Sequence, residues 1–203
     1  MPMKMNAQNT KIGENLIEDF EIILDILAGN RNAYAEIVRR YEARVRRYCL
    51  TMFANTGLAE EAAQEIFIKA YQALAQFRGN SSFSTWIYRI AANHCTDMLR
   101  KISRKKTESW EALLEKEGEK IEALFAVDPD ARKSDHAELV AKLLSHLSEP
   151  SRNALTLREI QGLSYQEMAG TLQCSVDAVK GRLKRARQEI ETKLRHLLKA
   201  GDV

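Results

Sequence analysis

Residues 163–187 limit the fold of this chain more than any other segment, because they predict two short helices joined by a tight turn. Ser164 and Glu167 have the spacing of a capping box, so a helix is expected to begin at Tyr165. Ser175 is a good N-cap for a second helix. The apolar positions of this second helix, at helical spacing, are Val176, Val179 and Leu183. This order is typical of a helix-turn-helix.

The second of these helices is strongly basic. Residues 175–199 contain eight Lys or Arg against three Asp or Glu. In a helix-turn-helix the second helix enters the major groove of DNA, where cations contact phosphates and guanine edges. The cations of its polar faces are Lys180, Arg182, Lys184, Arg185 and Arg187. The sequence therefore favours DNA binding; the alternative is a solvated amphipathic helix without a nucleic-acid partner.

The composition predicts an all-α protein. Of the 203 residues, 45% are hydrophobic, whereas only 3 are Pro and 9 are Gly, which favours packed helices over short strands or disorder. Residues 107–138 are acidic, with ten Asp or Glu against four Lys or Arg. We expect two small helical domains joined by a flexible linker, with the helix-turn-helix in the C-terminal domain.

The expected boundaries follow the helical patterns and the residues that interrupt them. A polar tail covers residues 1–15, and a first domain over 16–102 contains helices over 16–27, 33–53, 58–76 and 85–102. Turns are predicted at Gly29-Asn30 and over 55–57. The linker is expected over 103–135, with one short helix near 110–125 and a break at Pro129. The second domain covers 136–200, and Pro150 lies in the first turn of one of its helices.

The helix predicted over 58–76 has two distinct faces. The buried stripe is expected to contain Ala62, Ala63, Ile66, Phe67, Ala70, Tyr71 and Leu74. The outer face contains Glu61, Gln64, Glu65 and Ile68. Acid, amide and aliphatic groups together suit a surface for a partner protein, and the alternative is an ordinary solvated face.

Residues 77–86 form an aromatic, turn-rich loop. Ser84 is expected to cap the helix that follows. One side of that helix contains Trp86, Arg89, Asn93, Asp97 and Arg100. Aromatic rings, an amide and arginines are the groups that bind single-stranded nucleic acid. The alternative is that Phe83 and Trp86 are core residues beneath the loop.

The sequence lacks the residue patterns that other classes of function require. The four His are scattered without metal-ligand spacing, and no glycine-rich phosphate loop or activated nucleophile occurs, so we expect no enzyme, metal or cofactor. Cys49, Cys95 and Cys174 are widely spaced and odd in number, which indicates a reduced, cytoplasmic protein. Cys174 is either a redox sensor or a small buried residue. No signal peptide or apolar run of about 18 residues is present, so no membrane insertion is expected.

Several motifs together resemble one family. They are residues 60–67 (EEAAQEIF), Phe77-Arg78-Gly79, residues 85–91 (TWIYRIA) with Asn93 and Asp97, residues 163–165 (LSY), residues 179–183 (VKGRL) and Ala186-Arg187. In this order they resemble an extracytoplasmic-function (ECF, group IV) RNA polymerase sigma factor of the sigma-E type. The resemblance spans nearly the whole chain apart from the tail and the linker.

The resemblance implies partners for the surfaces described above. Glu61, Gln64, Glu65 and Ile68 would bind the clamp helices of the RNA polymerase β′ subunit, and the C-terminal domain would also touch the β flap. The promoter −10 element, with a flipped base, would contact Phe77, Gly79, Asn80, Ser81, Ser82, Trp86, Arg89, Asn93 and Arg100. The −35 element would contact Ser175, Ala178, Lys180, Gly181, Arg182, Lys184 and Arg185. The family also implies control by an anti-sigma factor.

The chain departs from the family pattern at a few positions. Gln173 replaces a frequent glycine in the turn, where a left-handed backbone is less comfortable for it. Gly181 offers no side chain to a base edge, so the bases contacted there do not follow from the resemblance. A helix-turn-helix regulator that binds intact operator DNA as a dimer remains the alternative function.

Overall fold

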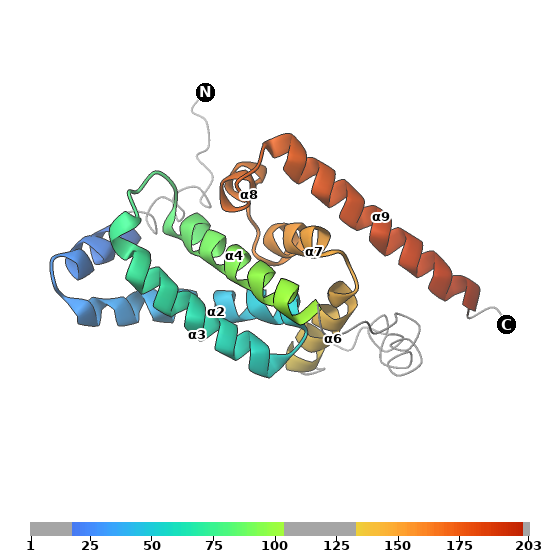
Figure 1. Ribbon diagram of the computed structural model, residues 1–203, viewed down its shortest axis with the longest axis horizontal. Coiled ribbons are helices and arrows are strands. Elements are labelled where there is room, and N and C mark those ends of the chain that lie inside the picture. Colours follow the sequence, from blue (N-terminus) through green and yellow to red (C-terminus); the bar gives the residue numbers. More distant parts are fainter. Residues whose placement is uncertain (1–17, 104–132, 201–203) are drawn as a thin grey trace, which may run out of the picture.

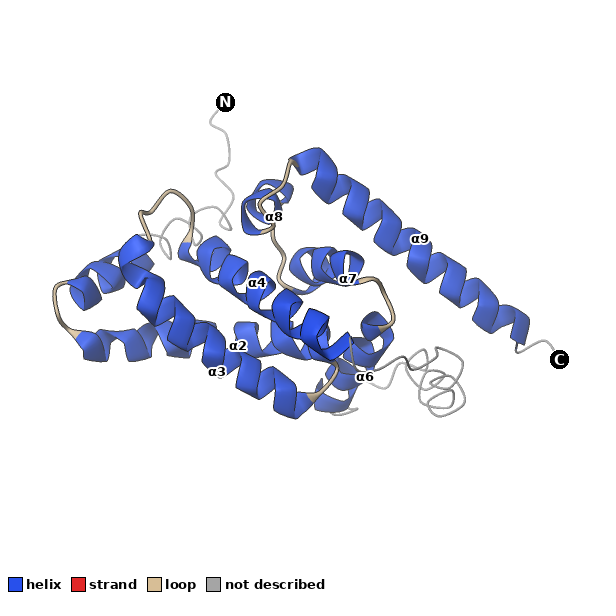
Figure 2. Cartoon of the chain, in the orientation of Figure 1, coloured by secondary structure: helices blue, strands red, loops and turns tan. Residues whose placement is uncertain are grey.

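The computed structural model describes residues 18–103 and 133–200, and within these two ranges every regular element is a helix and none is a strand. Figures 1 and 2 show the elements of residues 18–103 side by side at one end of the molecule. The C-terminal helices lie along the other side, with α9 (Val176–Ala200) as the long outer element (Figure 1). The all-α prediction is therefore confirmed for the described residues. The short helix expected near 110–125 lies outside them.

The first helices follow the predicted pattern closely. The described part of the N-terminal helix covers residues 18–27 and ends at Gly29, which has a φ of 114°. A short 3-10 turn, η1 (Arg31–Ala33), leads into α2 (Tyr34–Phe53). The buried face of α2 includes Ile37, Val45 and Tyr48. It packs against α3 (Thr56–Ala73), α4 (Phe83–Ser103) and α6 (Lys133–Ser145), which places α2 at the centre of the fold.

Two helices, α3 and α4, begin earlier than predicted because an earlier residue caps each of them. α3 (Thr56–Ala73) begins two residues early, since the side chain of Asn55 accepts a hydrogen bond from the backbone N–H of Leu58. The 3-10 helix η2 (Leu74–Gln76) completes it. α4 (Phe83–Ser103) is capped by Ser82 and not by Ser84, because Ser82 Oγ accepts from the N–H of Thr85 at 3.1 Å.

The first helix of the C-terminal half begins earlier than expected, whereas the two helices of the helix-turn-helix begin at the predicted residues. α6 (Lys133–Ser145) starts inside the range predicted as linker, because residues 133–135 contain neither Gly nor Pro and Pro129 lies four residues upstream. α7 (Glu149–Leu155) has Pro150 in its first turn, as predicted. A π-helical turn (Thr156–Ile160) follows, and α8 (Tyr165–Thr171) and α9 (Val176–Ala200) complete the chain.

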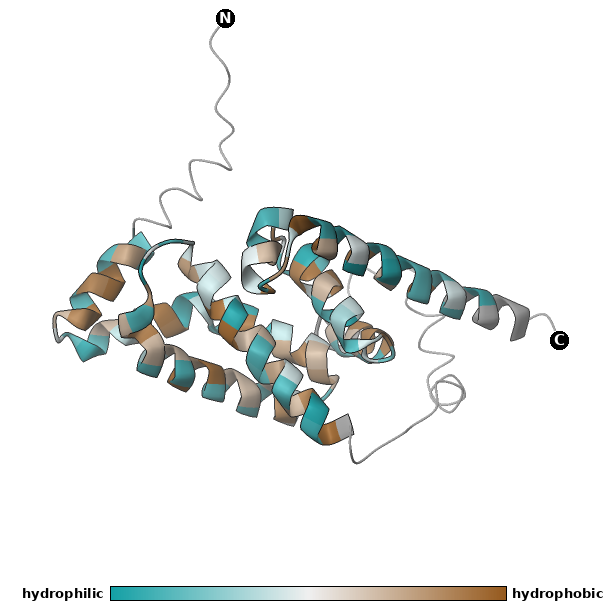
Figure 3. Ribbon diagram, turned by 45° about the horizontal axis from the view of Figure 1, so that its top comes forward, coloured by the Kyte–Doolittle hydropathy of each residue, from teal (hydrophilic) through white to brown (hydrophobic). Residues whose placement is uncertain are grey.

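One continuous cluster of buried side chains joins both halves of the molecule. Its largest fully buried members include Tyr48, Phe83 and Ile87 from the first half and Leu157 and Met168 from the second. In Figure 3 the hydrophilic colours follow the outer surface of α9, in keeping with its polar sequence. No described helix is long and apolar enough to cross a membrane.

Candidate nucleic-acid interface

The helix-turn-helix has the predicted capping geometry. Ser164 Oγ accepts from the N–H of Glu167, and the Glu167 carboxylate accepts from the N–H of Ser164, so the capping box is complete. Ser175 Oγ accepts from the N–H of Ala178 at 3.1 Å and caps α9. Between the helices Gln173 has a φ of 49°, which is the left-handed conformation expected to be uncomfortable at this residue.

The cations of α9 differ in whether they already form an ion pair within the protein. Lys180 makes an ion pair with Asp177 at 3.2 Å, and its side chain is 57% exposed. Arg187 lies 3.9 Å from Glu159, in an exposed pair. Lys184 and Arg185 are exposed and make no ion pair with any described residue, although Arg185 Nε donates to the Gly181 carbonyl. Lys184 and Arg185 are therefore exposed positive charges without a described counter-charge.

The remaining predicted −35 residues are the N-cap of α9 and residues of its first two turns. Ser175 is exposed, whereas Ala178, Gly181 and Arg182 are half-buried. No atom lies within 4 Å of the position that a Cβ would take at Gly181, so the helix is open there. Val179, Leu183 and Ala186 are buried on the opposite face against the rest of the molecule. The structure thus brings these seven predicted residues onto one accessible helix.

Trp86 lies in the core and exposes only 5% of its surface. Its ring centroid lies 5.4 Å from that of Phe83 and 5.5 Å from that of Phe77. Phe83 is also buried, so these two rings form the floor beneath the loop, as the alternative from the sequence allowed. The rings support the loop 77–82 from below, and Trp86 offers no free face for a base.

The structure separates the other predicted −10 residues into two groups. Gly79, Asn80 and Ser81 are exposed in the loop, next to the half-buried Phe77 and Ser82. The second group follows along α4 and consists of Arg89, half-buried, and Asn93 and Arg100, both exposed. Asn93 is ten residues into α4, or about 15 Å along its axis. A ligand that contacts both groups must therefore extend along the helix.

The outer face of α3 is exposed as predicted at Glu61, Gln64, Glu65 and Ile68. Tyr71 was expected in the buried stripe, and this was wrong: it is 38% exposed. Its ring packs edge-on against Tyr34, with centroids 4.9 Å apart, instead of pointing beneath the helix. The two tyrosines, with Ile68, line a shallow cavity of about 370 Å³ beside the outer face. The apolar part of this surface is thus larger than the sequence pattern indicated.

Comparison with known proteins identifies the family to which this chain belongs. Residues 37–105 match Sigma-70 region 2, and residues 137–190 match Sigma-70, region 4. The chain is 34% identical over 186 residues to the RNA polymerase sigma-H factor of Pseudomonas aeruginosa, which covers 90% of this chain and 96% of the relative. The ECF RNA polymerase sigma-E factor of Escherichia coli is 32% identical over 187 residues, with 90% and 97% covered. The chain belongs to the extracytoplasmic-function sigma factors of the sigma-70 family.

Solved structures support the same conclusion. CnrH, in complex with the cytosolic domain of CnrY, is 25% identical and superposes with a TM-score of 0.62, over 86% of this chain and 96% of that one. The sigma factor RpoE of Bartonella quintana, in complex with the anti-sigma factor NepR, has the same fold, with a TM-score of 0.61 at 22% identity and with 80% and 96% covered. This sigma factor is therefore a subunit that directs transcription initiation, and the operator-binding regulator is not the function that its family supports.

The region 2 and region 4 parts of this sigma factor are packed directly against each other by buried polar bonds, which no sequence pattern predicted. Tyr48 Oη in α2 donates to Asn153 Oδ1 in α7 at 2.9 Å. Tyr88 Oη in α4 donates to Gln161 Oε1 at 2.5 Å. Burial raises the pKa of Tyr48 well above its ordinary value and that of Tyr88 to about 12, so both hydroxyls stay protonated donors.

Arg152 is the most buried charged group of this contact, with 8% of its surface exposed. From α7 its guanidinium donates to the carbonyl of Met52 at the end of α2 and to the carbonyls of Ser145 and Leu147. Burial lowers the pKa of Arg152, and the nearby Glu149 opposes this change. Because α2 ends there, the cation also meets the negative end of a helix dipole.

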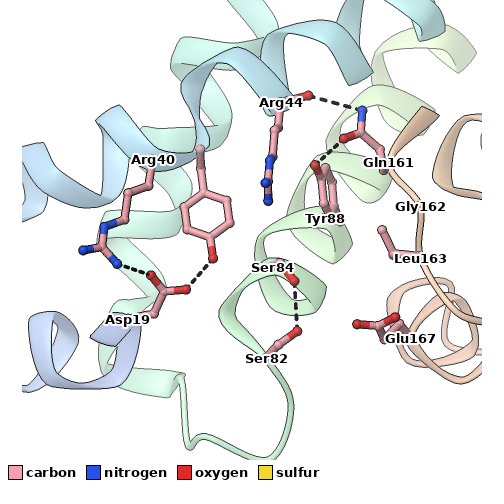
Figure 4. A pocket seen from close by; sticks show the side chains of 11 residues that line it. Asp19, Arg40, Arg44, Ser82, Ser84, Tyr88, Gln161, Gly162, Leu163 and Glu167 are labelled. Atoms are coloured by element: carbon pink, nitrogen blue, oxygen red, sulfur yellow. Dashed lines mark hydrogen bonds and ion pairs between the residues drawn. The ribbon is translucent and has the colours of Figure 1, made fainter. Parts of the chain in front are cut away.

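The helix-turn-helix itself touches the start of α4. Thr171 Oγ1 in α8 donates to the Thr85 carbonyl at 3.5 Å. Next to this contact is a cavity of about 390 Å³ between the two halves (Figure 4). Arg44 extends into it from α2, while Gln161 and Glu167 face it from the C-terminal side. Within the part of the chain that the structure describes, no group of three or more side chains could hold a metal ion.

Proposed function

We propose that this sigma factor binds core RNA polymerase and holds a promoter at two points, the −35 element through α9 and the −10 element through the loop 77–82 and α4. The observation that carries the proposal is the presence of both surfaces in one chain, each matched to a sigma region. We assign the −10 surface to the module of residues 16–102 and the −35 surface to a module that begins at Lys133. Polymerase would supply the chemistry, and the chain would catalyse no reaction of its own.

For the −35 element we assign phosphate contacts to Lys184 and Arg185, because these exposed cations lack an ion pair within the described residues. Lys180 would first have to exchange its bond with Asp177 for a DNA acceptor. Ser175, Ala178, Gly181 and Arg182 complete the surface. Since Gly181 is open and carries no side chain, the backbone of α9 can approach the groove closely there.

For the −10 element we assign the exposed loop residues and the outer side of α4 to the separated non-template strand. Phe77 and the residues 79–82 would hold a flipped base, while Arg89, Asn93 and Arg100 would contact the strand further along α4. Trp86 would act indirectly, because it is buried beneath the loop and supports Phe77. Extruding a base costs a few kcal/mol of stacking, which contacts in a pocket can offset.

For polymerase we assign the outer face of α3, with Glu61, Gln64, Glu65 and Ile68, to the β′ clamp helices. An exposed aliphatic side chain among exposed polar ones has the character of a protein interface. We place the β flap contact on the C-terminal module. A chain that works with polymerase on the chromosome would act in the cytoplasm.

The packed arrangement cannot bind both elements of one promoter. Elements centred at −35 and −10 are about 25 base pairs apart, or roughly 85 Å along B-DNA. Here the helix-turn-helix contacts the first turn of α4, with Thr171 Oγ1 and the Thr85 carbonyl at 3.5 Å. The two modules must therefore separate before the sigma factor can span a promoter, and the buried polar bonds between them set the cost of that step.

We further propose control by an anti-sigma factor that contacts both modules. The support is that CnrH and RpoE, which share this fold, are seen in complexes with CnrY and the anti-sigma factor NepR. Such a partner should lower promoter binding and bury surface on both modules. If the chain purified from its own cells were inactive and nothing co-purified with it, this part of the proposal would be wrong.

The proposed function is tested by transcription in vitro with core polymerase, comparing closed with pre-melted promoters. A sigma factor should allow initiation from both. A variant weakened at Asn93 should initiate only from the melted promoter. Absence of any RNA product, with the chain still binding duplex DNA tightly, would refute the proposal.

A further inference from the structure

Two cysteines of the region 2 module lie next to each other in its core, and neither has been given a role above. Cys49 is in α2 and Cys95 is in α4, two helices that pack together. Their Sγ atoms are 3.9 Å apart, and both residues are 0% exposed. The third cysteine, Cys174, is half-buried between α8 and α9. Cys49 and Cys95 therefore form a pair of facing thiols.

Each cysteine of this pair is next in sequence to a residue that binds the C-terminal module. In α2 this residue is Tyr48, whose Oη donates to Asn153 Oδ1 at 2.9 Å. In α4 it is Thr96, whose Oγ1 donates to the carboxylate of Glu149 at 2.7 Å. Both acceptors belong to α7. The thiol pair thus lies between the two hydrogen bonds that hold α7 against α2 and α4.

The pKa shifts of neighbouring groups agree with this placement. Burial raises the pKa of Tyr48, and Cys95, Cys49 and Glu149 add to that change, so groups of both modules surround the Tyr48 hydroxyl. The contact with Cys49, followed by burial, raises the pKa of Cys95 well above its ordinary value. Because the thiolate is the reactive form, the pair is inert while the modules are packed. Separation removes α7 from beside it and admits water and small oxidants.

We propose that Cys49 and Cys95 form a disulfide bond with a peroxide as oxidant while the modules are separated, and that this bond hinders their return to the packed arrangement. The inference goes beyond the function proposed above, although it rests on the separation of the modules described there. Both cysteines belong to one module, so the disulfide joins α2 to α4 and leaves the modules free to part. In a reducing compartment such a bond is transient, which suits a signal.

The oxidation consumes one molecule of hydrogen peroxide. The thiolate of one cysteine attacks a peroxide oxygen, the O–O bond breaks, and the sulfur becomes a sulfenic acid. The hydroxide that leaves takes up the proton of this thiol and becomes water. The second sulfur then attacks the sulfenic sulfur, the S–S bond forms, and the hydroxyl group leaves with the second thiol proton as water. The two thiols lose two electrons, and the peroxide is reduced to two molecules of water.

The disulfide changes the packing next to the contact of the modules. A bond between sulfur atoms is about 2 Å long, so atoms now 3.9 Å apart must approach each other by about 2 Å. Because the core is close-packed, α2 and α4 move with the sulfur atoms and carry Tyr48 and Thr96 with them. Hydrogen bonds tolerate only a narrow range of distances, so this shift weakens both bonds to α7. Their loss should raise the ratio of separated to packed molecules by about 5- to 150-fold.

The test uses the full chain with Cys174→Ser, so that the pair holds the remaining thiols. The chain is treated with hydrogen peroxide, free thiols are alkylated, and mass spectrometry follows the peptides joined by the disulfide. Tyr48→Phe removes a bond of the packed state and should speed disulfide formation by about 5- to 150-fold, because only separated molecules react. Tyr34→Phe is the matched control, since its hydroxyl donates to the Phe67 carbonyl within one module, and it should leave the rate unchanged.

The effect on the modules is measured by single-molecule energy transfer, with dyes attached to azide-bearing residues at positions 60 and 188. Oxidation should increase the separated population, and dithiothreitol should reverse this. Cys49→Ala and Cys95→Ala, each checked for folding by circular dichroism, should both abolish the response.

Three results would overturn the inference alone: no joined peptides in Tyr48→Phe, equal rates in Tyr48→Phe and the unchanged protein, or a disulfide that leaves the distance distribution as it was. A different result would refute the proposed separation of the modules and this inference with it. In that case the reduced chain would stay packed even when bound to core polymerase and promoter DNA.

Discussion

Removing the hydroxyl of Tyr48 should open the packed arrangement of the two modules. Tyr48 Oη donates to Asn153 Oδ1 at 2.9 Å, and both side chains are buried, with 0% and 4% exposed. When the modules separate, water can satisfy both groups. Tyr48→Phe therefore removes a bond that exists only in the packed state and leaves Asn153 Oδ1 buried without its donor.

The magnitude follows from these two terms. A buried hydrogen bond contributes about 0.5–1.5 kcal/mol net, and a buried polar atom left without a partner costs about 1–3 kcal/mol. The second value already includes the lost bond, so it alone applies here: the ratio of packed to separated molecules should fall by roughly 5- to 150-fold, since about 1.4 kcal/mol corresponds to a factor of ten. In the double variant with Asn153→Ala, the second substitution should add little, because both act on one interaction.

Single-molecule energy transfer between dyes on the two modules measures this equilibrium. Glu60 in α3 and Gln188 in α9 are exposed labelling positions, and Cys174→Ser removes the competing half-buried thiol. Tyr34→Phe is the matched control, because its hydroxyl donates to the Phe67 carbonyl at 2.7 Å within one module. An unchanged distance distribution for Tyr48→Phe, or equal opening by Tyr34→Phe, would refute the reasoning.

Three further predictions concern DNA and pH. Lys184→Ala with Arg185→Ala should weaken −35 binding and reduce its salt slope by about one unit for each lost phosphate contact, while polymerase binding is kept. Asn93→Ala should leave duplex affinity intact and impair strand opening, measured by permanganate reactivity of thymines. Burial and the nearby Lys69 hold the pKa of His94 below its ordinary value of 6.5. The folded chain then binds fewer protons than the unfolded one, so the free energy of unfolding should fall as the pH drops below about 6.5, and His94→Gln should flatten this dependence in urea titrations.

Each of these predictions has a contrary outcome. Loss of polymerase binding in the Lys184 and Arg185 double variant would place these cations in a protein interface or in the fold. Equal loss of duplex affinity and strand opening in Asn93→Ala would argue against a separate strand-holding role. A stability that is the same at about pH 7 and pH 5 would show that His94 titrates alike in both states.

Local features of the fold could be predicted because their causes are local. The capping box at Ser164 and Glu167 involves residues three apart, and its partners are visible in the sequence itself. The cap of α4 was assigned to the wrong serine because residues 81–84 offer three of them. The choice of Ser82 depends on Phe83, which is buried against Tyr41 and Trp86 as the first residue of the helix.

Contacts between distant residues could not be predicted in this way. Tyr48 and Asn153 are 105 residues apart, and helical periodicity indicates only that each lies on an inward face. Tyr71 has the sequence spacing of the buried stripe of α3, but its ring packs against Tyr34 at the surface instead of in the core. The N-terminal helix also has an exposed apolar stripe that was missed, because Phe20, Leu24 and Leu27 fit the same spacing that predicts a core face.

The contact of Glu189 with the start of α7 has a consequence for how α9 meets DNA. Its carboxylate accepts from the backbone N–H and hydroxyl of Ser148 and from the hydroxyl of Ser151. Burial alone would raise the pKa of Glu189, but these donors hold it below its ordinary value, so the Glu189 carboxylate stays ionised. Lys180 lies nine residues away, about 14 Å along the helix axis. Glu189 therefore anchors α9 to the start of α7. If a substitution at Glu189 let α9 tilt by about 10°, Lys180 would shift by roughly 2 Å, and we expect such a variant to alter the proposed −35 recognition without a change in any residue assigned to DNA.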